Sequence, residues 1–318
     1  MSTTSSWPDD RRLAWTLRAA LIVEATAWLV FAQHQLAAGQ GMARTLCSVL
    51  ALALGWRLCF VALSFAVKPL FAADRQLQRG VGPWLLAYLR ECWAMLRFYT
   101  HDQLWARSGG PDARQASQAT PVLLAHGFLC NGGVFVPLLA RLPTALAPYS
   151  VALEPSYRDF EHNLARLESA LDRLLAAHPG ERVLLVGHSM GGLLVRALAE
   201  RRPEAMAGVL ILAAPHHGTW FGNLVYGSEA GPPSARSRWL QAWNARAEPA
   251  AALPWLNAWT PQDNIVIPAA SSRWDKLAEQ CCEGQGHLSL LSDPAMLAAW
   301  VDWLMKAAKR AKEQRDGH

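Results

Sequence analysis

The pattern of apolar and polar residues changes sharply along the first part of the chain. Residues 1–12 are polar and contain Ser, Pro and Asp, which indicates a disordered N-terminus. Two apolar stretches follow, residues 14–36 and 45–67, and each is long enough to cross a bilayer as a helix. The connector between them, residues 37–44, is short and contains two glycines. We therefore predict a two-helix membrane hairpin over residues 13–68.

These apolar stretches have an alternative interpretation as two buried helices of a soluble domain. The membrane interpretation is favoured because both stretches precede the first strand signal, and the alternating strands and helices further along the chain form a complete pattern without them. The first stretch is also too long, and too polar in its middle, for the apolar segment of a signal peptide.

A third helix is predicted between residues 83 and 105. Apolar and aromatic residues recur there at helical spacing: Leu85, Tyr88, Leu89, Cys92, Trp93, Leu96 and Tyr99. The charged residues of the opposite face are Arg90, Glu91 and Arg97. Two interpretations stay open. The helix either lies in the membrane interface, which makes residues 69–106 an amphipathic interfacial region, or it packs on the domain that follows.

Residues 107–120 are rich in Ser, Gly, Gln and Pro and form a predicted linker. The pattern of apolar and polar residues changes after it. Short apolar runs predict buried strands at residues 121–125, 150–153, 182–186 and 208–212. Helical patterns lie between them at residues 160–178 and 193–202. Strands that alternate with helices predict an α/β domain with a mostly parallel sheet and helices on both faces.

Composition adds a few constraints. The chain is 52% hydrophobic and only 17% charged, which suits a large core, a membrane segment or both. Its six cysteines have no zinc-site or disulfide spacing, a pattern that suits a reducing compartment. The net charge of +5 comes mostly from scattered arginines. The basic tail, residues 306–318, is interpreted as the solvated end of a last helix, with contact to anionic lipid headgroups as the alternative.

The segment Gly187-His188-Ser189-Met190-Gly191 follows an apolar strand and opens a helical pattern. This is the nucleophile-elbow pattern, in which a sharp turn between strand and helix exposes a serine hydroxyl. The residues two before and two after the serine must be small because strand and helix approach closely, and both are glycine. The helix N-terminus favours a developing oxyanion. Ser189 is therefore the predicted nucleophile.

From about residue 120 to residue 305 the chain resembles the α/β-hydrolase family, in particular its bacterial lipase and esterase branch. The segments that carry the resemblance are the elbow, His-Gly-Phe at 126–128, Ala-Pro-His-His-Gly-Thr at 214–219, Asp-Asn-Ile-Val-Ile-Pro at 263–268 and Gly-His-Leu-Ser-Leu-Leu at 286–291. The order serine, acid, histidine matches the family. The resemblance implies an α/β-hydrolase fold over residues 121–305, with a lid insertion at about 219–259.

A serine nucleophile needs a general base, because its hydroxyl is a weak nucleophile at neutral pH. Resemblance to the family implies His287, which follows Gly286 and precedes an apolar helical pattern. His216 and His217 are the competing candidates. They follow a predicted strand, where the family has a substrate-side loop.

The base needs an acid that fixes its tautomer and stabilises the imidazolium. Asp263 fits this role, with the segment 264–268 behind it. Asp275 and Glu283 are nearer to His287 in the sequence, but neither follows a predicted strand.

An oxyanion hole needs two N–H groups aimed at one point. One is expected from Met190, and the resemblance implies that the other comes from Phe128. His126 and His188 are interpreted as structural residues. Related secreted lipases often hold a structural calcium near the histidine loop, but no ligands for it can be matched in this sequence. We expect no metal and no cofactor.

The insertion is rich in apolar residues: Trp220, Phe221, Leu224, Val225, Trp239, Trp243, Trp255 and Trp259. A lid this apolar suits an acyl chain. The alternative is that these residues only pack the lid on the core.

Together these patterns predict a membrane-anchored serine hydrolase that cleaves carboxylic esters of lipid-like substrates through Ser189, His287, Asp263 and an acyl-enzyme. One alternative keeps the triad in an acyl thioesterase or an acyltransferase. The other is a non-catalytic, membrane-bound interaction module on a hydrolase fold. The expected partners are the ester substrate and membrane lipids, with no nucleic acid and no obligate protein partner.

Charges near the apolar stretches predict their orientation. The basic residues outside the two spans are Arg11, Arg12, Lys68, Arg75 and Arg79, whereas the connector carries only Arg44. The positive-inside rule then places the domain on the cytoplasmic side of a bacterial inner membrane. Glu24 and Arg57 each lie about 15 Å from the cytoplasmic end of their span. An antiparallel hairpin brings them to one level near the bilayer midplane, where we expect them to pair.

Overall fold

The structure is a computed structural model of the 318-residue chain. It describes residues 11–77, 80–106, 110, 119–153, 159–222 and 237–316. Most of the segment expected to be a disordered N-terminus, most of the predicted linker and the last two residues of the tail lie outside the described residues.

A six-stranded parallel sheet forms the centre of the α/β domain, with the strand order β2-β1-β3-β4-β5-β6. The strands are β1 (Thr120–Ala125), β2 (Leu146–Ser150), β3 (Val183–His188), β4 (Met206–Leu212), β5 (Trp255–Trp259) and β6 (Glu279–Cys281). The helices around them are α6 (Val136–Leu139), α7 (Phe160–Ala177), α8 (Met190–Arg201), α10 (Arg238–Arg246) and α11 (Pro294–Asp316). Short 3-10 turns are η3 (Gly132–Phe135), η4 (Pro203–Ala205), η5 (Ala269–Ser272) and η6 (Ser289–Ser292).

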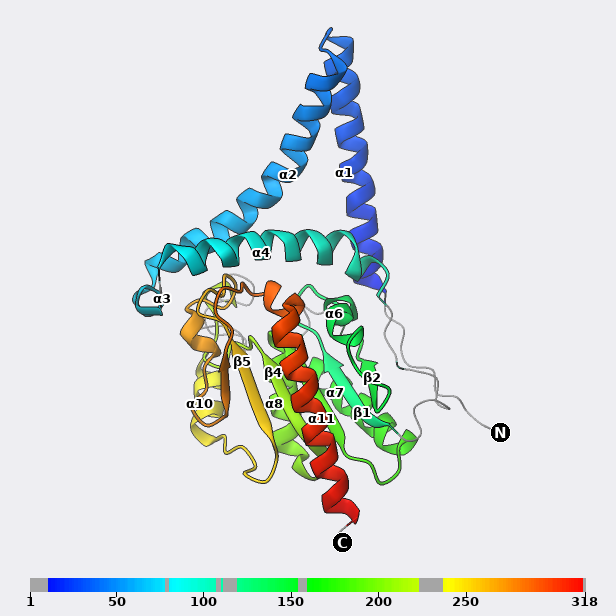
Figure 1. Cartoon of the computed structure of the whole chain (residues 1–318), viewed down its shortest axis with the longest axis vertical. Helices are drawn as coiled ribbons and strands as arrows, with labels where there is room; N and C mark the ends of the chain where they lie inside the picture. Colours follow the sequence, from blue (N-terminus) through cyan, green and yellow to red (C-terminus); the bar gives the residue numbers. More distant parts are fainter. Residues whose placement is uncertain are drawn as a thin grey trace, which may run out of the picture.

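Two helical layers cover the sheet, as a parallel sheet requires. Neighbouring residues of a strand face opposite layers because side chains alternate across a sheet. Leu123 of β1 packs in a core with α7, α8 and α10, whereas Leu124 packs in a second core with α6 and α11. Figure 1 shows α11 crossing one face of the sheet, with α7 and α8 behind the other. The predicted α/β class is confirmed.

The second strand begins four residues earlier than the apolar pattern predicts. The pattern indicates a strand at residues 150–153, but the structure has β2, which ends at Ser150. Pro148 inside β2 weakens the strand signal, and it is tolerated because β2 is an edge strand. The apolar residues that follow are buried in a loop, and Val151 N donates to Leu124 O at 3.1 Å.

The range 219–259, which was expected to hold a lid, is not all insertion. Its end forms β5, which lies between β4 and β6 in the central sheet. Trp255 and Trp259 are therefore sheet residues and do not belong to a lid. The buried Asn257 interrupts the apolar run of this strand, and its side chain is hydrogen-bonded to His216 and to Ser272 O. Because of this polar residue, β5 lacks the continuous apolar run that predicts a buried strand.

α1 (Arg12–Ala37) and α2 (Met42–Val67) form the hairpin that precedes the domain. In Figure 1 the two helices meet at their turn and diverge towards the domain. Both are long and apolar enough to cross a membrane, with mean hydropathies of 1.4 and 2.1 over their apolar windows. Only 6% of each window is buried. That exposure does not fit helices in the core of a soluble domain, which are mostly buried.

Glu24 and Arg57 pair across the hairpin, as their spacing predicts. Two hydrogen bonds of 2.6 Å join the carboxylate to the guanidinium. One Glu24 oxygen also accepts from the indole nitrogens of Trp28 and Trp56, both at 3.0 Å. Neither charge is left alone on the apolar helices.

α4 (Val81–Thr100) lies between the hairpin and the domain, across the open end of the hairpin (Figure 1). The short elements η1 (Lys68–Leu70) and α3 (Ala72–Leu77) precede it, and η2 (Asp102–Leu104) follows. Ala94 and Phe98 on one face belong to the core of the domain. On another face, Leu89 is 56% exposed and Trp93 is 62% exposed. The helix therefore packs on the domain and also presents an apolar surface.

Candidate active site

Ser189 occupies the tight turn between β3 and α8. Its φ of 57° and ψ of −123° are rare for a residue with a side chain. A Cβ on Gly187 would collide with the carbonyl oxygen of Gly191, and a Cβ on Gly191 would collide with that of Ala125. The two glycines of the elbow are thus required by the close approach that the sequence predicts.

His287 and Asp263 are brought together from the loops after β6 and β5. Nδ1 of His287 lies 2.9 Å from Oδ2 of Asp263, and both side chains are buried. The other carboxylate oxygen accepts from the backbone N–H groups of Ile265 and Val266 at 2.9 and 2.7 Å. Because the carboxylate accepts at Nδ1, the neutral ring carries its proton there and keeps Nε2 as the basic nitrogen.

The electrostatic surroundings of His287 favour its charged form. Burial lowers the pKa of this imidazole, but the charge and hydrogen bond of Asp263, together with the charge of Glu91, raise the pKa above its ordinary value. An imidazolium formed when His287 takes a proton is therefore stabilised in place.

His126 and His188 have structural contacts, as expected. Nδ1 of His126 lies 3.1 Å from Gly127 O, and its Nε2 accepts from Leu153 N at 3.3 Å. Burial lowers the pKa of His126 to about 4. His188 is also buried, which lowers its pKa well below the ordinary value, and its Nε2 lies 3.2 Å from His287 O. The second histidine therefore braces the backbone of the candidate base.

The competing candidates lie elsewhere. His216 is buried against Trp274 and its Nε2 lies 3.3 Å from Asn257 Oδ1. The charge of Asp275 acts on His217, whereas the carboxylates that act on His287 are Asp263 and Glu91. Glu283 is exposed. The described geometry therefore favours Asp263 and His287 over each competitor.

The candidate oxyanion groups come from two segments that lie beside Ser189. Met190 is the first residue of α8, where N–H groups point out of the helix. Phe128 is in the loop after β1 and lines the same cavity as Ser189 and His287. A Cβ on Gly127, the residue before Phe128, would lie 2.8 Å from Ser189 Cβ. The loop therefore passes directly beside the serine.

Glu91 of α4 joins the site, although the helical pattern placed it on a charged face. It is 2% exposed, and both carboxylate oxygens lie 3.0 Å from Leu288 N. One of them also accepts from Ser289 N at 2.8 Å. Burial raises the pKa of Glu91, and the two N–H groups oppose that shift. The one sequence signal for this burial is helical spacing. Glu91 lies on the same face of α4 as Ala87, Ala94 and Phe98, and all four residues are buried.

A second connection runs from the hairpin to the histidine loop. Asn264 Oδ1 accepts from His287 N at 3.0 Å, and Asn264 Nδ2 donates to Ser64 Oγ at 2.9 Å. Ser64 lies in the last turn of α2. The residue after the candidate acid thus connects the base to the apolar hairpin.

A third connection begins at Lys68, directly after α2. Its Nζ donates to Asp263 O and lies 3.6 Å from a carboxylate oxygen of Asp74. Asp74 in turn accepts from Ala269 N at 2.7 Å. Lys68 is fully buried, so it is not the exposed flanking charge that the orientation argument assumes. The six strands and the helices beside them form the α/β pattern without the hairpin, as predicted, but the loop after β5 is bonded to the end of α2 through Ser64 and to Lys68.

The cavity beside Ser189 has a volume of about 180 Å³. The wall residues that come from α2 and α4 are Phe60, Val61, Glu91, Met95 and Tyr99. None of the described lining residues comes from the insertion. Instead Trp243 of the insertion packs against Phe160 of α7, with tilted rings, and donates to Glu200 of α8. Leu224 and Val225 lie outside the described residues. Among the described residues, the cover of the site is therefore made by α2 and α4.

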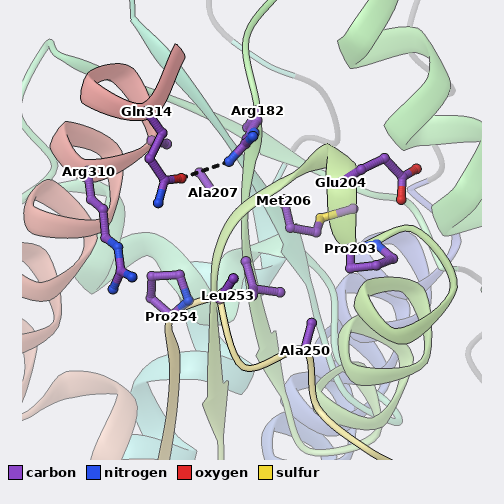
Figure 2. Close-up of a pocket in the computed structure, with 12 residues that line it drawn as sticks. Arg182, Pro203, Glu204, Met206, Ala207, Ala250, Leu253, Pro254, Arg310 and Gln314 are labelled. Atoms are coloured by element: carbon purple, nitrogen blue, oxygen red, sulfur yellow. Dashed lines mark hydrogen bonds between the residues drawn. The ribbon is translucent and has the colours of Figure 1, made fainter. Parts of the chain in front are cut away.

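A cavity of about 240 Å³ lies at the opposite end of the sheet, near the beginnings of β3 and β4 (Figure 2). Arg182, Glu204, Arg310 and Gln314 are among its lining residues, and Arg182 donates to Gln314 at 2.9 Å. The lining contains no serine, cysteine or histidine. Among these residues no hydroxyl or thiol accompanies the carboxylate of Glu204, and ligands of α/β sheets bind at the carboxyl ends of the strands.

Comparisons with known proteins agree with this fold. A model described as "Alpha/beta hydrolase family" matches residues 122–315. A protein named probable esterase PIR7A, from Oryza sativa subsp. indica, is 38% identical over 94 residues, which is 29% of this chain and 36% of that protein. A triacylglycerol lipase of Vibrio cholerae is 38% identical over 112 residues, which is 34% of this chain and 36% of that protein. The chain thus spans 36% of the length of each of these relatives.

Two solved lipase structures are similar to part of the chain. The Bacillus licheniformis lipase BlEst2 in mature form gives a TM-score of 0.48 at 13% identity, covering 59% of this chain and 92% of that chain. The monoacylglycerol lipase of Paleococcus ferrophilus gives a TM-score of 0.45 at 19% identity, covering 59% and 96%. The family model covers more than half of the sequence. The chain therefore belongs to the alpha/beta hydrolase family.

Proposed function

We propose that this protein is a membrane-anchored serine hydrolase that cleaves carboxylic esters of lipid-like substrates. His287 takes the hydroxyl proton of Ser189 as Oγ attacks the ester carbonyl, and the N–H groups of Phe128 and Met190 bind the oxyanion. His287 then gives its proton to the leaving alcohol. Water, deprotonated by His287, cleaves the acyl-enzyme and releases the acid.

One observation carries the catalytic part of this proposal. It is the buried hydrogen bond of 2.9 Å between His287 and Asp263, beside a serine held at a φ of 57°. The raised pKa of His287 supports its role as a base, because the imidazolium must form during the attack. The names of the relatives, esterase and lipase, support an ester as substrate.

The walls of the cavity support a lipid-like substrate. Phe60 and Val61 come from an apolar helix whose length suits a membrane span, and Met95 comes from the helix beneath it. A substrate that reaches Ser189 therefore passes apolar side chains close to the proposed membrane. An apolar acyl group gains more from that surface than a polar substrate does.

Labelling of the full chain with a fluorophosphonate probe tests the nucleophile. We expect wild type and the control Ser169→Ala, an exposed serine on α7, to be labelled, and Ser189→Ala to be unlabelled. A panel of p-nitrophenyl esters, glycerides and acyl-CoAs then tests the substrate class. Preference for acyl-CoA would support the thioesterase or acyltransferase alternative. A wild type that is neither labelled nor active would contradict an enzyme and favour the interaction module.

We also propose that the α/β domain faces the cytoplasm of a bacterial inner membrane. With Lys68 buried, the orientation rests on the arginines beside the spans. A reporter that works only in the periplasm should be active when inserted at the hairpin turn, near Gly39, and inactive at the C-terminus. The reverse pattern would overturn the orientation.

A further inference from the structure

A second cavity lies inside the hairpin region, between α1, α2 and α4. It has a volume of about 360 Å³, and Figure 1 shows the three helices that enclose it as a triangle. Its lining residues are Leu17, Ala20, Leu21, Glu24, Trp56, Arg57, Met95, Tyr99 and Thr100. The α/β domain contributes none of these described residues.

The second cavity shares a wall with the cavity beside Ser189. Met95 and Tyr99 of α4 line both cavities. Tyr99 is fixed, because its hydroxyl donates to Leu129 O at 3.2 Å. Met95 has an unbranched, flexible side chain that adapts to a neighbour. A ligand that extends from one cavity to the other therefore passes these two side chains, of which Met95 is the adaptable one.

The lining favours a neutral, apolar occupant. Leu17, Ala20 and Leu21 supply one apolar face along α1. The two charged groups, Glu24 and Arg57, neutralise each other through bonds of 2.6 Å. A charged ligand would find no free counter-charge among these residues, and its desolvation would be costly.

Size and depth point to an acyl chain. The cavity beside Ser189, about 180 Å³, is smaller than the roughly 300–1,000 Å³ of small-molecule sites, so a long chain needs more room. Glu24 lies about 18 Å along the axis of α1 from its first residue, at a rise of about 1.5 Å per residue. Half of the hydrocarbon core of a bilayer is about 15 Å. A lipid in the nearer leaflet has its ester at the membrane surface and the end of its acyl chain at the midplane. Ser189 and Glu24 match these two depths, with the serine at the ester and the glutamate at the end of the chain.

We propose that the cavity between α1, α2 and α4 binds the acyl chain of the membrane ester whose carbonyl is held at Ser189. This inference rests on the function proposed above. The substrate then enters sideways from the bilayer, past Met95, and its polar part stays at the membrane surface. Chain length is then measured by the hairpin.

Two matched variants of α1 test the proposal in the full chain in detergent micelles. Ala20→Phe fills the cavity, whereas Ala19→Phe adds the same ring to an exposed position on the opposite face of the helix. We expect Ala20→Phe to lower the ratio of kcat/KM for p-nitrophenyl palmitate to that for p-nitrophenyl butyrate by about tenfold, the effect of about two displaced methylene groups. Ala19→Phe should leave this ratio unchanged. An unchanged ratio in Ala20→Phe, with both esters still hydrolysed, would overturn the acyl-chain site and leave the proposed hydrolase intact.

Photo-crosslinking tests binding without any hydrolysis. A diazirine-bearing palmitoyl ester is added to the Ser189→Ala protein in phosphatidylcholine vesicles. We expect crosslinks at Met95 that Ala20→Phe suppresses and Ala19→Phe does not. Crosslinks at the exposed Trp93 alone, or at Met95 with no effect of Ala20→Phe, would show ordinary bilayer contact and overturn the proposal. This result does not depend on whether the wild type hydrolyses either ester.

Discussion

The carboxylate of Glu91 lies against the backbone of Leu288, with both oxygens 3.0 Å from its nitrogen. Leu288 directly follows His287, so a helix that packs beneath the hairpin fixes the backbone of the candidate base. The bonded N–H groups of Leu288 and Ser289 also lie at the start of η6, where N–H groups lack partners of their own. Glu91 therefore acts as a positioning residue through the loop, and through its charge it also acts on the imidazole.

Replacing Glu91 by glutamine should impair the base in two measurable ways. Glutamine offers one oxygen and turns an NH₂ group towards backbone donors, so we expect kcat to fall about tenfold, the worth of a hydrogen bond to a charged group. The lost charge also lowers the pKa of His287. The acid limb of the kcat/KM profile on p-nitrophenyl butyrate should then move to lower pH.

Glu283→Gln is the matched control, because this carboxylate is exposed and near in sequence to the same loop. It should leave the profile unchanged. A purely structural role for Glu91 would lower the Tm of the Gln variant without moving the acid limb, and that outcome would contradict the electrostatic part of the assignment.

The pH dependence of the wild type follows from the raised pKa of His287. The base works only when neutral, so activity should be full above that pKa and fall as the pH drops through a value above the ordinary 6.5. Asp263→Asn removes the largest of the effects that raise the pKa, and the limb should shift to lower pH. We expect kcat to fall about 10⁴-fold as well, because the tautomer is no longer fixed.

Asp275→Asn serves as the control for this experiment and should behave as wild type. An Asp263→Asn profile with an unshifted limb would mean that another group raises the pKa. Ser189→Ala and His287→Ala should each be more damaging than Asp263→Asn, since nucleophile and base act as one unit.

The pair Glu24 and Arg57 should show strong coupling. A single Glu24→Leu or Arg57→Leu leaves one charge near the bilayer midplane, at a cost of about 2.5–3.5 kcal/mol in insertion free energy. The double replacement leaves no charge and should recover most of the loss. The measurement is the fraction of protein that stays in the membrane pellet after a carbonate wash. Additive losses would show that the pair is not coupled, and complete release of the wild type would contradict a membrane span.

Lys68 should be a major contributor to stability. Lys68→Met leaves the buried Asp74 without its cation, which we expect to lower the free energy of unfolding by about 3–5 kcal/mol. Adding Asp74→Asn removes the remaining charge and keeps an oxygen for Ala269 N, so the double variant should recover much of the Tm measured in detergent. Lys309→Met, at an exposed ion pair on α11, should change Tm little. A double variant no more stable than Lys68→Met would refute the coupling.

Features with local causes could be predicted from the sequence. The elbow needs glycines two positions from Ser189, and both are there because of close backbone approach. The equal depth of Glu24 and Arg57 follows from the fixed rise per residue of two antiparallel helices. The contact between the two side chains, which this depth predicts, is confirmed. The order of Ser189, Asp263 and His287 belongs to the family pattern, and their catalytic role stays a prediction.

Contacts between distant parts of the chain could not be predicted. The bond of Glu91 to the histidine loop spans 197 residues, and that of Ser64 to Asn264 spans 200. No local spacing encodes such a partner, and a lone carboxylate on a helix normally indicates a solvated face. The apolar pattern failed to predict β5 for a related reason. Asn257 is buried because it has distant hydrogen-bond partners, which the apolar pattern of the strand does not reveal.

The long separation between these partners has a consequence during synthesis. Ser64, Lys68 and Glu91 leave the ribosome nearly 200 residues before the loops that they bind. At about 5–20 residues per second this is a delay of roughly 10–40 s. The hairpin and α4 therefore exist as a template before either loop has been translated. If the hairpin inserts in a membrane as proposed, a chain that reaches the membrane late also lacks an ordered partner for the loops of Asp263 and His287 until the insertion is complete.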